Sequence, residues 1–467
     1  MKSRRRSSMS PTSTQRSSDP RCRAVDLLVE LERGRRTLDA LMDGMEASGG
    51  LRDGRDRDLL NAILFGVLRW RARLDYIIAR FSKTPLDKID LPILNILRAG
   101  VFQLIFLTRT PPSAAVNTSV EMAKSMGAPW VAAFVNAVLR RAAAEHGSVR
   151  FPDPRREPVR SMAAAWAFPE WLTERWMGRF GADLTAELFE SINAVPPLTL
   201  RANTLKTQRA DLVAALQTEA KAVEACTLAP DGLRVEGLRT RMTALSSFRQ
   251  GWFQVQDEAA QIVSLLLAPR PGEAVLDACA GRGGKTGHIA QLMGNQGTLV
   301  ALDRSATRLA ALREEMRRLG VSIVSCREAD LSDGSTEEAP IRFDRVLLDA
   351  PCSGLGTLRR NPDIKWAEGR KDLGRYHQTQ LALLKRAAER VERGGVLVYA
   401  VCSSEPEETV EVLRTFLAEN PRFQSDGDDR EIPETVRPLL DAQGFLQTYP
   451  HLRYMDGFFA ARLRLKR

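Results

Sequence analysis

Apolar residues recur at steps of three and four through the first third of the chain, which is the spacing of a helix that buries one face. In the first such segment, RCRAVDLLVELERG, the residues Ala24, Leu27, Leu28 and Leu31 share one helical face. The spacing continues through DRDLLNAILFGVLRWRARLDYIIARF and LPILNILRAGVFQLIFL, and no strand pattern comes between these segments. Residues 21–147 are therefore predicted to form an all-helical domain.

The pattern changes after this domain. Between residues 148 and 170 four prolines stand among charged residues, a composition that predicts a linker. From residue 171 to residue 250 the segments are mixed. WLTERWMGRF and QRADLVAALQTEA have helical spacing, whereas PPLTLRANT and DGLRVEG have the pattern of short strands. These segments predict a small α+β module.

Short apolar runs alternate with helical segments over residues 251–467. Strands are expected in EAVLDACA, TLVALDRS, VSIVSCREAD, FDRVLLDAP and GGVLVYAVCS, and helices in TGHIAQLM, SATRLAALREEMRRLG and YHQTQLALLKRAAERVERG. This alternation predicts right-handed βαβ units in a doubly wound parallel sheet, which is an α/β domain. The last segment, GFLQTYPHLRYMDGFFAARLRLKR, adds two strand-like runs that are expected to form an antiparallel edge.

Composition places limits on the class of protein. The chain has 467 residues, 44% hydrophobic and 27% charged, which is ordinary for a globular protein of two or three domains. No uninterrupted apolar run approaches the length of a bilayer span, which excludes a transmembrane protein. The six cysteines form no C-x-x-C pair, which argues against a disulfide framework and favours a reducing, cytoplasmic compartment. The four histidines match no H-E-x-x-H pattern, so no metal site is expected.

Positive charge is concentrated at the start of the chain. The net charge is +10, from 68 basic and 58 acidic residues, and residues 1–23 hold seven basic residues against one acidic residue, or +6. Residues 1–20 are also rich in serine and are expected to be a disordered tail. No apolar core follows the charges, so a secretion signal is not supported. The tail is either merely solvated or an arm that adds non-specific affinity for a polyanion.

The first strand of the α/β domain ends in a glycine-rich turn, DACAGRGGKT. Gly281, Gly283 and Gly284 allow a tight turn and close approach of a ligand to the backbone. Asp303 closes the second strand, 26 residues after Asp277 (303 − 277), where a carboxylate can accept both hydroxyls of a ribose. Neither G-x-G-x-x-G nor a Walker A loop is present, so a nucleoside cofactor without phosphates, such as S-adenosylmethionine, fits best. Asp330, which closes the third strand, strengthens this prediction.

Two cysteines follow neighbouring strands and are expected to project into one cleft. Cys352 lies just after the fourth strand and Cys402 just after the fifth, where loops carry function. A thiolate that adds to C6 of a cytosine makes C5 nucleophilic enough to take a methyl group from a sulfonium donor. Asp349, if it holds or shares a proton, could stabilise the adduct near N3, and Lys285 could add positive charge.

Cys279 and Cys326 are expected to pack rather than to act in catalysis, since a free cysteine is commonly a buried packing residue.

These motifs resemble the RNA cytosine-C5 methyltransferases of the Sun/Nop2 family. The resemblance is carried by DACAGRGGKTGHIA, DAPCSGLGTLRRNPDIKW, VCS followed by acidic residues, and DGFFAARL. Upstream, PPSAAVNTSVEMAK and FVNAVLRR look like the NusB-like helical domain that precedes the catalytic part in one subfamily. The resemblance implies a NusB-like RNA-binding domain, a small α+β RNA-binding module and a Rossmann-like methyltransferase domain that uses S-adenosylmethionine.

The resemblance also implies roles for individual residues. Cys402 would be the nucleophile and Cys352 would assist release of the product, whereas Pro-Cys carries the nucleophile in DNA cytosine methyltransferases, which makes Cys352 a competitor for that role. The implied cofactor contacts are Cys279, Ala280, Gly281, Arg282, Gly283, Gly284, Lys285, Asp303, Asp330 and Asp349. Arg282 stands where the family usually has proline, and it either pairs with the cofactor carboxylate or points outward.

The implied partner is small-subunit ribosomal RNA, and the oligomeric state is left undetermined. Two alternatives stay open. The same chemistry could act on transfer RNA, or the chain could be a non-catalytic RNA-binding or ribosome-assembly factor that has kept the fold. Retention of both cysteines argues against the second alternative.

Overall fold

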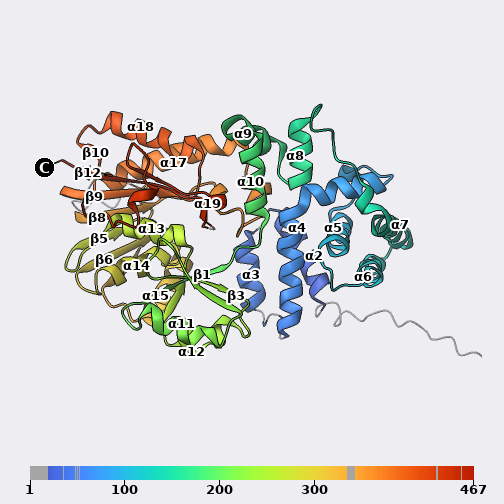
Figure 1. Cartoon of the computed structure of the whole chain (residues 1–467), viewed down its shortest axis with the longest axis horizontal. Coiled ribbons are helices and arrows are strands. Elements are labelled where there is room, and N and C mark those ends of the chain that lie inside the picture. The colour runs from blue at the N-terminus through green and yellow to red at the C-terminus, as the bar shows by residue number, and fades with distance from the viewer. Residues whose placement is uncertain are drawn as a thin grey trace, which may run out of the picture. The chain divides into compact units, whose positions relative to one another are not determined.

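The protein is described from a computed structural model. The structure describes residues 19–466 except residues 35, 48, 50, 52, 334–341, 428–429 and 454. The chain divides into two compact units, Met1–Asn193 and Ala194–Arg467 (Figure 1). The prediction of a disordered basic tail falls almost wholly outside the described residues.

The first unit is helical, as predicted. Asp19 caps its first helix, because the carboxylate accepts a hydrogen bond from the backbone N–H of Arg21 at 2.8 Å. Arg98 is buried in this unit and is neutralised by Asp75 at 2.6 Å and Glu32 at 2.8 Å. The helices are α2 (Pro20–Glu32), α3 (Leu38–Ala47), α4 (Gly54–Phe81), α5 (Leu91–Phe106), α6 (Pro112–Lys124) and α7 (Pro129–Glu145), with the short 3₁₀ turns η1 (Leu86–Lys88) and η2 (His146–Ser148).

A helix lies in the stretch that was predicted to be a linker. Pro158 occupies the first turn of α8 (Pro158–Trp166), where the missing N–H has no helical partner to lose, so this proline begins a helix. Two helices that the sequence analysis grouped with the α+β module, α9 (Glu170–Phe180) and α10 (Ala182–Asn193), belong to the helical unit. Phe168 and Phe189 stack there with ring centroids 3.6 Å apart.

The second unit begins with a four-stranded antiparallel sheet in the order β2-β3-β1-β4. This confirms a small α+β module, although the sequence analysis identified only β1 and β3 among its strands. Apolar side chains of the sheet pack on α11 to form the core of the module. The elements are β1 (Leu198–Ala202), α11 (Arg209–Gln217), β2 (Ala222–Ala225), β3 (Gly232–Glu236), η3 (Met242–Ala244), α12 (Ser246–Arg249) and β4 (Phe253–Val255).

The larger sheet has the strand order β10-β12-β9-β8-β5-β6-β7, with β11 paired to β12. Strands β5 to β9 are parallel, as predicted, and β12 is antiparallel to β9. The two strand-like runs expected at the end of the chain are β11 and β12, which add antiparallel strands at this side of the sheet, and β10 also pairs with β12. The strands are β5 (Ala274–Asp277), β6 (Thr298–Asp303), β7 (Val324–Glu328), β8 (Phe343–Asp349), β9 (Val391–Val401), β10 (Phe423–Ser425), β11 (Phe445–Gln447) and β12 (Phe459–Leu465).

Helices cover both faces of this sheet. Side chains of α17 and α18 join one core cluster and those of α13 and α14 join another, on opposite sides of the strands in Figure 1. The described helices are α13 (Glu258–Leu267), α14 (Gly284–Leu292), α15 (Ala306–Leu319), η4 (Leu355–Thr357), α16 (Ile364–Ala367), α17 (Arg370–Ala388), η5 (Pro406–Glu408), α18 (Val410–Glu419), η6 (Arg437–Leu439) and α19 (Pro450–Arg453). This is the doubly wound α/β arrangement that the sequence predicts.

Two arginines join the small sheet to the larger domain. Arg201 of β1 is buried and donates hydrogen bonds to Gln291 Oε1 at 3.2 Å and to the carbonyl of Gly284 at 3.1 Å, both on α14. Arg360 donates to the carbonyl of Pro197 at 3.2 Å and to Asp257 at 2.7 Å. Polar contacts, several of them buried, therefore hold these two parts of the second unit together.

Candidate active site

Parallel strands place their carboxyl ends along one edge of the larger sheet, and the predicted site residues gather there. Asp277 ends β5, Asp303 ends β6 and Asp349 ends β8, while Cys402 directly follows β9. Asp330 lies two residues beyond β7 with its side chain exposed, where Ser332 donates two hydrogen bonds to it and lowers its pKa. The order of the strands therefore explains why residues more than a hundred positions apart in the chain meet.

The glycine-rich turn is held against β6 by a carboxylate. Asp303 accepts hydrogen bonds from the backbone N–H of Gly281 at 2.9 Å and of Ser305 at 2.8 Å. Gly281 and Gly283 have φ values of +57° and +84°, which L side chains rarely adopt. A Cβ at Gly281 or Gly284 would meet no atom within 4 Å, so open space lies over the turn. The turn therefore leaves room for a ligand beside Gly281 and Gly284.

Lys285 and Asp349 form an ion pair beside this turn, with Lys285 Nζ 2.6 Å from Asp349 Oδ2. Burial opposes the lysine charge, but Asp349, Cys402 and Asp277 outweigh it and raise the pKa of Lys285 above its ordinary value. Lys285 therefore remains an ammonium that can donate a proton or a hydrogen bond. Burial also raises the pKa of Asp277 to about 7, and its Oδ1 has no partner among the described residues.

The two predicted cysteines touch. Cys352 Sγ and Cys402 Sγ are 3.1 Å apart, both thiols are free, and both residues are half-buried. The hydrogen bond to Cys402, burial, and the negative charges of Cys402 and Glu408 raise the pKa of Cys352 well above its ordinary value. Cys352 therefore favours its protonated form and can donate a hydrogen bond toward Cys402.

Three segments that carry the sequence motifs meet at this pair. The backbone N–H of Gly356 donates to the carbonyl of Cys402 at 2.9 Å, and the N–H of Gly457 donates to the carbonyl of Gly356 at 2.8 Å. The next residue, Phe458, places its ring centroid 5.0 Å from Lys285 Nζ. The segment just before β12 is thus part of the wall of the site.

Glu408 is a residue that the sequence analysis missed. Its buried carboxylate accepts hydrogen bonds from Ser353 and Ser403, the residues that directly follow the two cysteines. The only local signal was the run of acidic residues that follows Cys402. The sequence analysis noted the acidic residues after VCS but did not single one out.

The remaining residues are spread around the site. Cys279, just past β5, has a pKa raised to about 12 by burial and nearby carboxylates, and Cys326, on β7, has a pKa raised by burial. Both are poor sources of a thiolate, in agreement with a packing role. Arg282 is exposed. His288 is buried and its pKa is lowered well below its ordinary value by burial and by Arg201.

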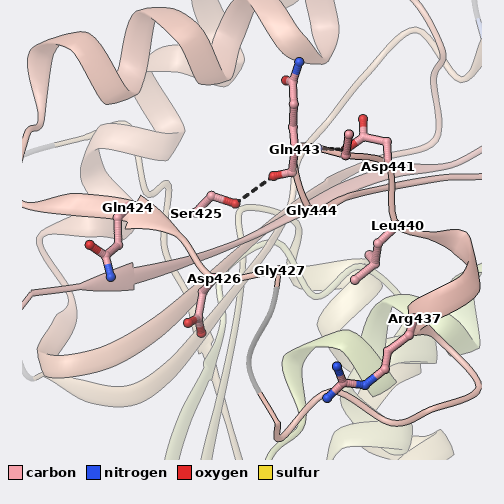
Figure 2. A pocket seen from close by; sticks show the side chains of 10 residues that line it. Gln424, Ser425, Asp426, Gly427, Arg437, Leu440, Asp441, Gln443 and Gly444 are labelled. Carbon is pink, nitrogen blue, oxygen red and sulfur yellow. Dashed lines mark hydrogen bonds between the residues drawn. The ribbon is translucent and has the colours of Figure 1, made fainter.

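A pocket elsewhere on the domain is separate from this site. Figure 2 shows it between β10 and the turn before β11, with a volume of about 680 Å³. Ser425 donates to the carbonyl of Gln443 at 3.0 Å, and Asp441 accepts from two backbone N–H groups of its own turn. None of the cysteines, and none of the cofactor residues predicted from the sequence, lines this pocket.

Two general findings concern the described part of the chain. It holds no group of three or more His, Cys, Asp or Glu side chains placed to bind a metal ion. Within the same residues, no helix combines the length and the apolar character that crossing a membrane requires.

The fold and the site together are those of an S-adenosylmethionine-dependent methyltransferase: a doubly wound sheet, a glycine-rich turn without a phosphate-binding motif, a carboxylate at the end of the second strand of the domain, and a thiol pair at the same edge. Comparison with known proteins agrees. Residues 264–464 match the family described as 16S rRNA methyltransferase RsmB/F. Residues 18–144 match the NusB family, and residues 168–240 match the ferredoxin-like domain of RsmF/B-like methyltransferases.

Similarity extends over most of the chain. It is 36% identical over 95% of its length to the probable ribosomal RNA small subunit methyltransferase B of Bacillus subtilis, covering 98% of that protein. It is 35% identical over 95% of its length to ribosomal RNA small subunit methyltransferase B of Pseudomonas putida, again covering 98% of the relative. The chain belongs to the RsmB/F family of 16S rRNA methyltransferases.

Solved structures show the same architecture. The crystal structure of PH0851 has a TM-score of 0.79 and 26% identity, covering 95% of this chain and 98% of its own. A methyltransferase homolog protein from Pyrococcus horikoshii has a TM-score of 0.56 and 28% identity, covering 66% of this chain and 99% of its own. The predicted NusB-like, α+β and Rossmann-like methyltransferase parts are thereby confirmed as fold classes.

Proposed function

We propose that the protein transfers a methyl group from S-adenosylmethionine to C5 of a cytosine in small-subunit ribosomal RNA, through a covalent bond between Cys402 and C6. The observation that carries the proposal is the 3.1 Å contact between Cys402 and Cys352 beside the Lys285–Asp349 ion pair. Relatives of the chain are named for methylation of small-subunit ribosomal RNA, which supports the substrate and a cytoplasmic location.

The glycine turn and Asp303 would form the binding site for the cofactor. The open space beside the glycine turn suits the methionine part, and Asp303 suits the ribose. The bound cofactor supplies an electrophilic methyl group on a positively charged sulfur. Asp277, with an unpartnered buried oxygen next to the turn, adds negative potential when it is ionised.

Cys402 would act first, because Cys352 keeps its proton. The thiolate of Cys402 forms a bond to C6, and the electrons of the C5–C6 double bond shift so that C5 becomes nucleophilic. Lys285, paired with Asp349, donates a hydrogen bond or proton toward N3 and stabilises the negative charge that develops there.

The methyl group reaches C5 as its bond to the cofactor sulfur breaks, with the bonding electrons left on that sulfur. C5 must then lose its proton, which solvent water can accept. The electrons of the C5–H bond then restore the double bond, and the C6–S bond breaks to expel the Cys402 thiolate. Cys352, at 3.1 Å, can hydrogen-bond to the departing sulfur and so assist release. The target base must leave its stack for Cys402 to reach C6, so we expect an unstacked or flipped nucleotide.

Single cysteine variants test these roles. Cys402→Ala should be inactive and should form no denaturant-resistant complex with RNA, because the C6 bond cannot form. Cys352→Ala should accumulate such a complex, seen as a slow band on a denaturing gel that disappears after nuclease treatment. The reverse pattern would assign the nucleophile to Cys352. Intact methylation in both variants would disprove the covalent mechanism.

The target nucleotide needs a separate experiment. The resemblance implies cytosine 967 of 16S rRNA. Bisulfite sequencing of ribosomal RNA from a deletion strain should show one cytosine that loses protection. Loss of protection in transfer RNA instead would favour the transfer RNA alternative. Unchanged protection in both RNAs would favour a non-catalytic binding or assembly factor.

A further inference from the structure

Glu408 is a buried carboxylate that contacts both cysteine-bearing loops. It ends η5, six residues after Cys402 (408 − 402), and its exposed fraction is 0%. Its Oε1 accepts hydrogen bonds from the backbone N–H of Ser353 at 2.8 Å and from Gln380 Nε2 at 3.0 Å. Its Oε2 accepts from the hydroxyls of Ser353 and Ser403, both at 2.5 Å. One side chain thus binds the residue after each cysteine.

Burying a carboxylate without a cation costs several kcal/mol, and the donors around it must offset that cost. Among the described residues no Lys, Arg or His nitrogen lies within 4.0 Å of the Glu408 carboxylate. Its four hydrogen bonds therefore offset the cost of burying its charge. The donors are themselves held in place: Gln380 also donates to the carbonyl of Pro351 at 3.1 Å. The hydroxyl of Tyr399 donates to the backbone carbonyl of Glu408 at 2.6 Å. The position of the carboxylate is therefore fixed from several segments at once.

We propose that Glu408 is a positioning residue that holds the Cys352 loop and the Cys402 loop at the separation where the two sulfurs touch. The proposal rests on the proposed function, because it assigns a purpose to that contact. The negative charge of Glu408 also favours the protonated form of Cys352. It thereby helps Cys352 to retain its proton.

Other titratable groups besides Glu408 also lie near Cys352 and Cys402. Cys402, just after β9, and Glu408 of η5 both raise the pKa of Cys352. A negative charge on Cys352 in turn raises the pKa of Tyr376 on α17 and of Tyr399 on β9. Lys285 and its partner Asp349 lie on the side of Cys402. Among the described residues, the titratable groups that act on Cys352 or on its partner are therefore Cys402, Glu408, Tyr376, Tyr399, Lys285 and Asp349.

Glu408→Gln separates the charge of this residue from its shape. A glutamine can keep an oxygen for the two N–H donors, while its amide donates to the two serine hydroxyls, which also accept hydrogen bonds. Glu408→Ala removes both the charge and the hydrogen bonds. Glu407→Gln is the matched control, because it removes a carboxylate from the preceding residue of η5 while the serines stay bonded to Glu408.

The test measures the initial alkylation rate of each cysteine by iodoacetamide as a function of pH, by peptide mass spectrometry on the full chain without RNA. In Glu408→Gln the midpoint for Cys352 should move to lower pH by about one unit, because a nearby negative charge has been removed. Glu407→Gln should leave the midpoint where it is. In methylation assays Glu408→Gln should lower kcat by about tenfold or more with the KM for S-adenosylmethionine unchanged.

An alkylation profile of Cys352 that is the same in Glu408→Gln and the unaltered protein would overturn the proposal. If Glu408→Ala fails to fold, Glu408→Gln alone decides. Failure of the proposed function would instead appear in the methylation assay, as intact methylation by Cys402→Ala. The alkylation profile of Cys352 does not depend on that result.

Discussion

At the scale of single residues, Asp277 is a carboxyl group that titrates near neutral pH. Burial raises its pKa to about 7, while a carboxyl in an unfolded chain has a pKa near ~4. Between these values the folded state holds a proton that the unfolded state has lost. The stability from this group is therefore complete below about pH 4 and is lost as pH rises through about 7.

Asp277→Asn should flatten this dependence, since an amide does not titrate. Without cofactor, the melting temperature of the unaltered protein should fall between pH 5.5 and pH 8 by a few degrees more than that of the variant, at roughly 2–4 °C per kcal/mol. Asp456, whose pKa burial also raises to about 7, contributes the same slope to both proteins. Parallel melting curves would show that Asp277 does not carry the effect.

Arg282 offers a second test at this scale. Its exposed side chain stands in the glycine turn where the family usually has proline. If it pairs with the cofactor carboxylate, Arg282→Ala should raise the KM for S-adenosylmethionine severalfold, as expected for a lost charge-assisted hydrogen bond, and leave the KM for RNA alone. An unchanged KM for the cofactor would show that the side chain points outward.

At the scale of elements, close approach of backbone segments shapes the site. A Cβ at Gly356 would lie 1.9 Å from the carbonyl oxygen of Gly457 and 2.9 Å from that of Cys402. Gly356→Ala should therefore push the segment before β12 away from the end of β9, lower the stability by about 1–3 kcal/mol, and reduce kcat. Chemical denaturation and single-turnover methylation would measure the two effects.

Gly374 provides the matched control. It lies within α17, and a Cβ there would meet no atom within 4 Å. Gly374→Ala should raise the stability by about 0.5–1 kcal/mol, because alanine favours a helix over glycine, and should leave methylation unchanged. Equal losses in both variants would mean that the contact at Gly356 has no special role.

The same scale shows how far the sequence predicts the structure. Long periodic segments, such as α4 and α17, and apolar runs, such as β8 and β9, can be predicted from the sequence, because the burial of these elements determines the spacing of their apolar residues. The three-residue strand β4 is too short to show a period, and α8 begins at Pro158 in a proline-rich stretch whose composition favours a linker. Glu408 escaped because its donors come from residues as far as 55 positions away, and no local pattern records such partners.

At the scale of the whole molecule, the charge of the first residues bears on RNA binding. Residues 1–23 carry +6 of the net +10 and include no aromatic residue for stacking on bases. Deletion of residues 1–20 should weaken binding to RNA mainly at low salt, since fewer counterions are released, and should reduce the salt dependence of the affinity. Filter binding over a range of salt concentrations would measure this. A change in the cytosine that is modified would contradict a purely non-specific role.

The buried arginine of β1 has a consequence for how the second unit opens and closes. Arg201 bonds to the carbonyl of Gly284 on α14 as well as to Gln254 of β4, so separating the small sheet from the glycine-rich turn removes part of the hydrogen bonding of a buried guanidinium. They should therefore share one cooperative opening event. Saturation with S-adenosylmethionine should slow hydrogen–deuterium exchange at the amides of β1, although no cofactor contact is assigned there. In Arg201→Met the same cofactor should protect the turn while leaving β1 to exchange at its own rate.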